Sequence, residues 1–260
     1  MKKKPFLFFV TLLVVAAAVS FAQKQLPPEG GAPRDFKLPP KLTFTLRNGV
    51  NVTMVQYGSL PKVTISVIVR SGNMNEQSNE VWLSDVTGDL MKEGTTSRSA
   101  QQIAEEAAAM GGTVNVSVGL DQTTINGDVL SEFAPRLVEI LADVIRNPLL
   151  PESELARIKN DRIRQLTVQR SQPSSLTLEQ FRRIIYGDHP YGRIFPTQEM
   201  LQSYAIQQVR DFYKKNFGAL RTSIYVAGQF DGKEVERALR NAFADWEQGA
   251  EPLINIPKPS

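Results

Sequence analysis

The period of the apolar residues changes along this 260-residue chain, and that change limits the folds open to it. Most segments between Lys41 and residue 130 have the two-residue alternation of β-strands. From Ser131 onward the period is helical, apart from one late strand at residues 221–229. Strands first and helices afterwards indicate an α+β layer structure, in which helices pack on a mixed sheet.

The strand segments have clear local signals. Two alternating runs within residues 41–56 are joined by Asn48-Gly49, which predicts a β-hairpin. Residues 63–70, VTISVIVR, are mostly apolar and β-branched, which predicts a strand buried on both faces. Residues 113–118 and 122–129 alternate again and predict a second pair of strands.

The helix segments are marked by apolar stripes and by capping residues. Residues 82, 83, 86, 90 and 91 form a helical stripe, and Ser99 with Gln102 forms a capping box that opens a second helix, stopped by Gly111-Gly112. Further helices are predicted at residues 133–146, 151–170, 173–187, 199–216 and 233–246.

The two ends of the chain are predicted to lie outside this fold. Residues 1–22 have three lysines, an apolar run and a small-residue ending, the layout of a signal peptide cleaved after Ala22. This predicts a periplasmic or secreted protein, and only the alternative of an uncleaved anchor would tie it to a membrane. Residues 23–40 are a Pro/Gly-rich linker, and residues 251–260 are the start of a linker or tail.

Charge and cysteine content exclude several classes of protein. The chain has 30 basic and 27 acidic residues, and removing the three lysines of residues 1–22 leaves 27 of each. A net charge of zero gives no reason to expect a nucleic-acid partner. The chain has no cysteine, so the domain must be held together by packing without disulfides.

Several phrases, in order, resemble the N-terminal half of the insulinase, pitrilysin and processing-peptidase family. They are RNGVNVTMVQ, VIVRSGNMNE, MKEGT, MGGTVNVSVGLDQTTINGDVL, RNPLLPESELARIKN and YGDHPYG. The resemblance covers residues 41–250, a metallopeptidase-like N-terminal domain. It implies a half-clamshell, a mixed and largely antiparallel sheet covered on one side by helices. Two such halves normally close around an unfolded peptide.

Active members of that family carry an H-x-x-E-H motif on the first helix. Two histidines one turn apart bind zinc, and the glutamate is the base toward the metal-bound water. Alignment on Gly94-Thr95 places the five motif positions at Asp85, Val86, Thr87, Gly88 and Asp89. Both histidine positions are therefore aspartate and the base position is glycine. The resemblance implies a degenerate zinc motif at Asp85, Gly88 and Asp89.

The acidic third ligand of the family comes from a later helix. At that place this chain has Arg164 and Gln165, and its nearest acid, Asp161, lies a turn away. With all four chemical positions lost, we expect no catalytic residue, no metal ligand and no cofactor, whereas active relatives bind zinc. Gly88, which costs a helix about 1 kcal/mol against alanine, is interpreted as drift after the loss of catalysis.

Other candidate sites are weaker. Asp85 and Asp89 are spaced to hold a cation together, but hard cations take six or more oxygen ligands, so the pair is interpreted as solvated charge. His189 is the chain's single histidine and is interpreted as a structural turn residue. Gly111-Gly112 precedes a strand, the wrong order for a phosphate loop. Acceptor triplets for glycosylation at Asn51 and Asn115 fall inside strand patterns and are attributed to chance.

Three functions remain open. The first is a non-catalytic partner or scaffold subunit that helps an active zinc-peptidase relative, or a missing C-terminal half, to bind extended peptides along the sheet edge. The second is a metal-dependent endopeptidase that uses Asp85, Asp89 and an unidentified third ligand. The third is a stand-alone peptide-binding module outside the cytoplasm.

Overall fold

The computed structural model describes residue 31 and residues 37–253. The described residues from Pro39 onward form one compact unit, and its hydrophobic core draws on side chains from Leu46 to Trp246. The predicted signal peptide lies outside the described residues, as do most of the predicted linker and residues 254–260. Within the described part of the chain, no helix has the length and apolar character needed to span a bilayer.

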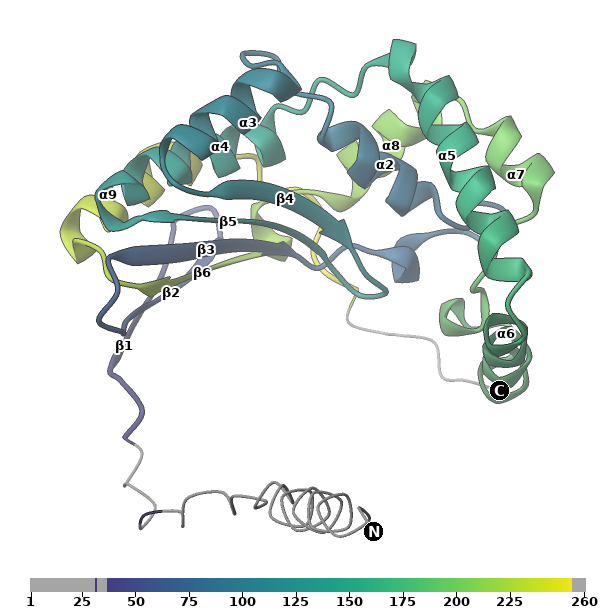
Figure 1. Ribbon diagram of the computed structural model, residues 1–260, viewed down its shortest axis with the longest axis horizontal. Coiled ribbons are helices and arrows are strands. Elements are labelled where there is room, and N and C mark those ends of the chain that lie inside the picture. The colour runs from purple at the N-terminus through teal and green to yellow at the C-terminus, as the bar shows by residue number, and fades with distance from the viewer. Residues whose placement is uncertain (1–30, 32–36, 254–260) are drawn as a thin grey trace, which may run out of the picture. The chain divides into compact units, whose positions relative to one another are not determined.

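A six-stranded sheet is the centre of the unit (Figure 1), with strand order β1-β2-β6-β3-β5-β4. Only β2 and β6 pair in parallel, and the other neighbours are antiparallel. The strands are β1 (Lys41–Thr45), β2 (Asn51–Gln56), β3 (Lys62–Val69), β4 (Thr113–Val118), β5 (Thr123–Leu130) and β6 (Thr222–Gly228). The predicted mixed, largely antiparallel sheet is confirmed.

The Asn48-Gly49 turn joins β1 to β2 as predicted. Gly49 has φ 99°, in the left-handed region that glycine adopts without steric cost. The side chain of Asn48 is buried and donates to the carbonyl oxygens of Phe243 (2.7 Å) and Trp246 (2.9 Å). The turn residues therefore also fix the end of the last helix against the sheet.

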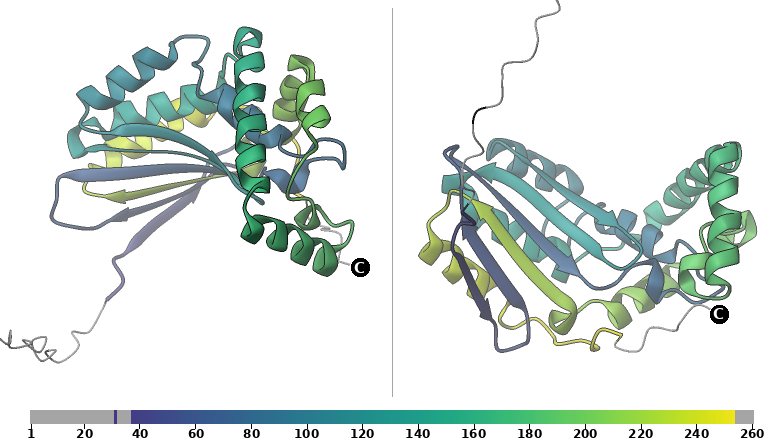
Figure 2. Two further views of the ribbon diagram at one scale, coloured as in Figure 1. Left: turned by 45° about the vertical axis from the view of Figure 1, so that its right-hand side comes forward. Right: turned by 90° about the horizontal axis from the view of Figure 1, so that it is seen from below.

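Helices cover only one face of the sheet (Figures 1 and 2). Those along the face are α3 (Ala100–Ala109), α4 (Ala134–Arg146) and α9 (Gly232–Phe243). The remaining helices lie beyond one end of the strands and are α2 (Leu83–Met91), α5 (Glu152–Arg170), α6 (Pro173–Tyr186), α7 (Gln198–Ser203) and α8 (Ile206–Asn216). Helix α4 lies at the centre of the layer, with a fully buried stripe that includes Leu137, Leu141 and Ile145.

This one-sided cover contradicts the predicted burial of β3 on both faces. Val63, Ile65 and Val67 are buried beneath the helices, whereas Thr64 is exposed and Ser66 half-buried on the other face. The prediction was wrong because β-branched content marks a strand without showing how many of its faces are covered.

The single helix predicted at residues 199–216 is two helices, α7 and α8. The chain is extended at Tyr204 (ψ 126°) and Ala205 (ψ 155°), which separates them. The buried Tyr204 hydroxyl donates to the carbonyl oxygen of Val81 at 2.7 Å. A contact 123 residues away thus holds the break, and the apolar period cannot reveal it.

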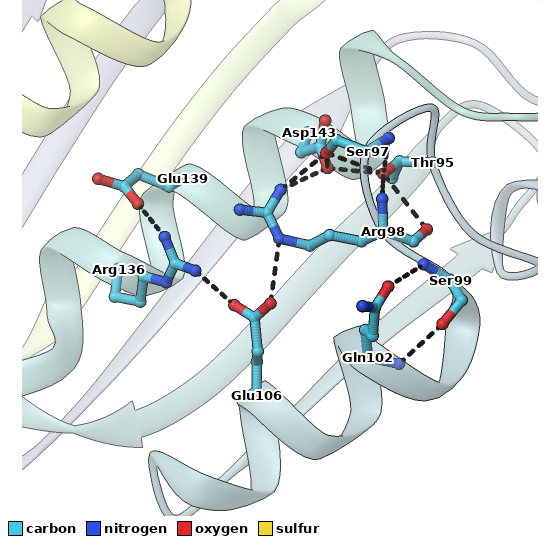
Figure 3. A network of polar contacts seen from close by, with 9 residues as sticks. All are labelled: Thr95, Ser97, Arg98, Ser99, Gln102, Glu106, Arg136, Glu139 and Asp143. Carbon is cyan, nitrogen blue, oxygen red and sulfur yellow. Dashed lines mark hydrogen bonds and ion pairs between the residues drawn. The ribbon is translucent and has the colours of Figure 1, made fainter.

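The segment that follows α2 is fixed by a polar network centred on Asp143 of α4 (Figure 3). The Asp143 carboxylate accepts from the hydroxyls of Thr95 and Ser97, both at 2.7 Å, and from Arg98 at 2.6 Å. Burial acts to raise the pKa of Asp143, but these hydrogen bonds outweigh it and the pKa is lowered. Ser99 and Gln102 form the predicted capping box beside this network.

Candidate functional site: a charged cluster between α2 and α5

Helix α2 carries the residues that the resemblance places at the zinc motif. Val86, Leu90 and Met91 are buried in the core, so the helix is fixed in rotation. Asp85 and Asp89 lie one turn apart and share the flank that faces α5. The predicted common face of the two carboxylates is present.

A guanidinium group from α5 lies between these carboxylates. Arg162 Nε donates to Asp89 Oδ2 at 2.6 Å, and Arg162 Nη1 donates to Asp85 Oδ1 at 3.2 Å. Nη1 also donates to Oε1 of Gln165 at 3.0 Å. The three charged side chains are only 14 to 22% exposed. The interpretation of Asp85 and Asp89 as solvated charges is therefore wrong, because a partly buried cation pairs with both.

Arg162 was not predicted from the sequence. The neighbouring Arg164 and Asp161, which lie near the predicted place of the acidic ligand, pair with each other on the exposed side of α5. The signal was present in the spacing, because Arg162 lies midway between the buried residues Ile158 and Leu166 at four-residue intervals. An arginine on the buried stripe of a helix requires an acidic partner nearby.

The surroundings of Asp85 remove it further from water. Asn73 Nδ2 donates to Asp85 Oδ2 at 2.8 Å, and the Trp82 ring lies 6.0 Å from the guanidinium carbon of Arg162. Burial raises the pKa of Asp85, while Arg162 and Asn73 lower it. The effect of burial is the larger, so the pKa is raised overall. Such a carboxylate depends on its cation to stay ionised.

The start of α2 depends on a second acid, Glu76. Its carboxylate accepts from the backbone N–H groups of Trp82 (3.1 Å) and Ser84 (2.9 Å). These bonds hold Trp82 at φ 69°, a backbone region that large side chains rarely occupy. Burial raises the pKa of Glu76 to about 7, although hydrogen bonds from Ser84 and Asn73 oppose the shift. Because both carboxylate oxygens accept bonds that order α2, Glu76 has a structural role.

The motif position that holds the base in active relatives is closed by packing. Gly88 is buried, and an ideal Cβ built on it would lie 2.4 Å from Cγ2 of Val118 on β4. A side chain at residue 88 therefore requires the Val118 side chain, or one of the two elements, to shift. This close approach gives Gly88 a packing reason and replaces its interpretation as drift.

The contacts of His189 involve two tyrosines and none of the residues of the charged cluster. It is buried at the turn after α6, its Nδ1 accepts from the N–H of Tyr191 at 3.1 Å, and its ring packs against Tyr191 and Tyr186. These contacts agree with its interpretation as a structural turn residue.

The residues at the cluster do not fit zinc. The inward oxygens of Asp85 and Asp89 already accept from Arg162, and Gly88 offers no base. No group of three or more histidine, cysteine or acidic residues among the described residues is placed to hold a metal ion. A cleft of about 320 Å³ beside the cluster is lined by both acids and bases, including Lys92, Glu93 and Arg157.

Comparison with known sequences identifies the family. The sequence model of the insulinase family, peptidase family M16, matches residues 52–196, and that of the peptidase M16 inactive domain matches residues 204–260. The chain belongs to the insulinase family. The predicted resemblance is thereby confirmed.

Similar M16 proteins come from several bacteria. An uncharacterised zinc protease of Rickettsia felis is 30% identical over 205 residues, which are 78% of this chain and 50% of that protein. One from Bacillus subtilis is 27% identical over 198 residues, 75% of this chain and 48% of that protein. The chain thus spans about half the length of the curated relatives it matches.

Solved structures show the same fold. A peptidase M16 inactive domain from Pseudomonas fluorescens has a TM-score of 0.75 at 21% identity, over 85% of this chain and 54% of that one. The first half of the periplasmic protease PqqL of Escherichia coli has a TM-score of 0.72 at 15% identity, over 85% of this chain and 50% of that one. The half-clamshell fold is confirmed.

Proposed function

We propose that this M16 protein is a non-catalytic homologue that works outside the cytoplasm as a partner or scaffold subunit. In that role it helps an active relative, or a C-terminal half, to hold unfolded peptide. The observation that carries the proposal is the Arg162 guanidinium bonded to Asp85 and Asp89, where an active relative has its metal ligands.

Loss of catalysis follows from the chemistry that this arrangement lacks. Peptide hydrolysis in active relatives needs a metal-polarised water and a base that accepts its proton. A guanidinium cannot activate water in this way, because it has no open coordination position and donates protons only in hydrogen bonds. Gly88 has no proton acceptor in its side chain. The cluster therefore holds a cation between two acids but has no group that can activate water.

Peptide binding is supported by the free edge of the sheet. In the described part of the chain, β4 pairs with β5 alone, so its other side presents unpaired backbone groups. An extended peptide adds to such an edge through main-chain hydrogen bonds, without a metal. The contact between Gly88 and Val118 places this edge beside α2, where a peptidase would need its substrate.

The uncovered face of the sheet supports the same use. A row of paired residues crosses it through Thr53, Tyr225, Ser66, Asn126 and Asn115, as the strand registers show. None of these side chains is charged, and Tyr225 is 46% exposed. Such a neutral polar row with one aromatic ring suits a polypeptide of varied sequence.

Zinc retention tests the proposal. Residues 23–260 are purified, exposed to a slight excess of zinc and desalted, and metal content per chain is measured beside an M16 relative with an intact H-x-x-E-H motif. We expect about one zinc per chain in that relative and none here. About one zinc per chain here would overturn the proposal in favour of a metal-dependent endopeptidase that uses Asp85 and Asp89.

Peptide binding is measured on the same sample with fluorescein-labelled, unfolded casein. We expect binding that EDTA leaves unchanged, and no cleavage. If casein stays unbound both alone and with an active relative present, the scaffold role is wrong. Binding that gains nothing from an active relative would identify a stand-alone peptide-binding module instead.

A further inference from the structure

Helix α6 exposes the side that a helix of a folded domain normally buries. It has no buried residue. Its outward side carries large apolar residues, with exposed fractions of 46% at Leu178, 56% at Phe181, 81% at Ile184 and 44% at Ile185. We call these four residues the α6 stripe.

The side of α6 that packs on the domain is polar instead. Ser175, Glu179, Arg182 and Tyr186 are half-buried, and their spacing of four, three and four residues places them on one face. Glu179 lies 3.9 Å from Arg170 of α5. An amphipathic helix that turns its polar face inward leaves its apolar face for a partner.

The order of residues along the stripe indicates which partner fits. Leu178, Phe181 and Ile185 are three and four residues apart, the spacing of a two-helix seam. Toward the start of α6 the same seam continues through the small residue Ser174. The seam formed by Ser174, Leu178, Phe181 and Ile185 is thus large at one end, small at the other and uncharged throughout.

From this order we propose that α6 is a self-association surface on which a second copy of this chain packs its own α6 antiparallel. That arrangement places Ile185 of one copy opposite Ser174 of the other, and Phe181 opposite Leu178. Large residues then face small ones, as in a well-packed helix pair. A parallel pair would set Ser174 against Ser174, which leaves a gap at that end.

The apolar area that the α6 stripe offers limits the strength of this association. Four large side chains with these exposed fractions offer about 400 Å² per copy, or about 800 Å² in both, below the roughly 1,200–2,000 Å² of stable complexes. We therefore expect a concentration-dependent dimer that forms at about 10–300 µM. The inference rests on α6 alone, so its failure would leave the proposed function untouched.

Introduced cysteines test the geometry, since the chain has none of its own. Ser174→Cys and Ile185→Cys variants of residues 23–260 are prepared, one of them with an affinity tag. Each variant alone and an equal mixture of the two are then oxidised. In the antiparallel pair, residue 174 of one chain lies opposite residue 185 of the other chain. The two copies of residue 174 are about 16 Å apart along the helix axis. We expect a disulfide dimer in the mixture and little in either sample alone, because a disulfide needs Cα atoms within about 7 Å. Self-linked Ser174→Cys, or no linkage in the mixture, would refute the pairing.

Sedimentation equilibrium tests the surface without cysteines. Phe181→Glu should abolish dimerisation, whereas Leu60→Glu, at a 72% exposed residue between β2 and β3, should leave it unchanged. Both variants should unfold at the wild-type urea concentration, because neither side chain is buried. Wild-type protein that stays monomeric at 300 µM would overturn the proposal. Co-sedimentation of that monomer with vesicles of phosphatidylglycerol and phosphatidylethanolamine would assign the stripe to a lipid surface.

Discussion

Replacing Arg162 by methionine tests the central contact of the α2–α5 cluster. Methionine keeps most of the aliphatic length and removes the cation that pairs with Asp85 and Asp89. Removing one partner of a fully buried ion pair costs about 3–5 kcal/mol, whereas an exposed pair contributes less than about 1 kcal/mol. With side chains 14 to 22% exposed, we expect a loss of about 2–3 kcal/mol.

Urea unfolding followed by tryptophan fluorescence measures this loss. Trp82 lies 6.0 Å from the guanidinium carbon of Arg162, so its emission also reports local change in the folded state. At a slope of about 2–3 kcal/mol per molar urea, the expected loss lowers the midpoint by roughly 1 M.

Two further variants make the Arg162 result specific. Arg164→Met removes the ion pair with Asp161, in which the Arg164 side chain is 71% exposed. It should change the free energy of unfolding by no more than about 0.5 kcal/mol. Adding Asp85→Asn and Asp89→Asn to Arg162→Met should recover about half of the loss, because no unpaired charge remains buried. Equal effects of Arg162→Met and Arg164→Met would refute the reasoning.

Three further predictions concern the support of α2. The pKa of Glu76 is about 7 in the folded state against 4.5 in the unfolded state. The stability that this group contributes is therefore complete below pH 4.5 and falls by up to about 3 kcal/mol as the pH rises to 7. Glu76→Gln should flatten this pH dependence of the unfolding free energy in urea titrations, and an unchanged pH dependence would contradict the prediction. Asp143→Ala removes the acceptor that four side-chain donors share and should cost about 3 kcal/mol, against less than about 0.5 kcal/mol for the exposed Glu139→Ala. Gly88→Ala should destabilise by about 1–2 kcal/mol in the wild type yet be neutral or stabilising beside Val118→Ala, and strictly additive effects would show that the two residues do not touch.

Features fixed by neighbouring residues could be predicted from the sequence. The turn at Asn48-Gly49 and the capping box of Ser99 and Gln102 involve residues at most three apart, and both are present. The order of strands and helices likewise follows from local periodicity. These signals, with the family resemblance, were sufficient for the half-clamshell fold.

Features fixed by distant residues could not be predicted in this way. The break between α7 and α8 depends on a hydrogen bond from Tyr204 to Val81, and the burial of β3 depends on which face the helices cover. The pairing of Asp85 with Arg162 spans 77 residues. The family resemblance predicts which residues stand at the zinc-motif positions, but only the structure shows that Arg162 pairs with two of them.

The replacements at the site depend on one another physically. Two aspartates one turn apart with little exposure would repel each other, so Asp85 and Asp89 are tolerable together because Arg162 supplies a cation. Likewise Val118 can approach α2 because residue 88 has no side chain. Restoring the two histidines and the glutamate alone would leave Arg162 beside a bound cation and press the glutamate into Val118. We therefore interpret the cluster as a structural contact between α2 and α5, at the positions where the resemblance predicts the zinc motif.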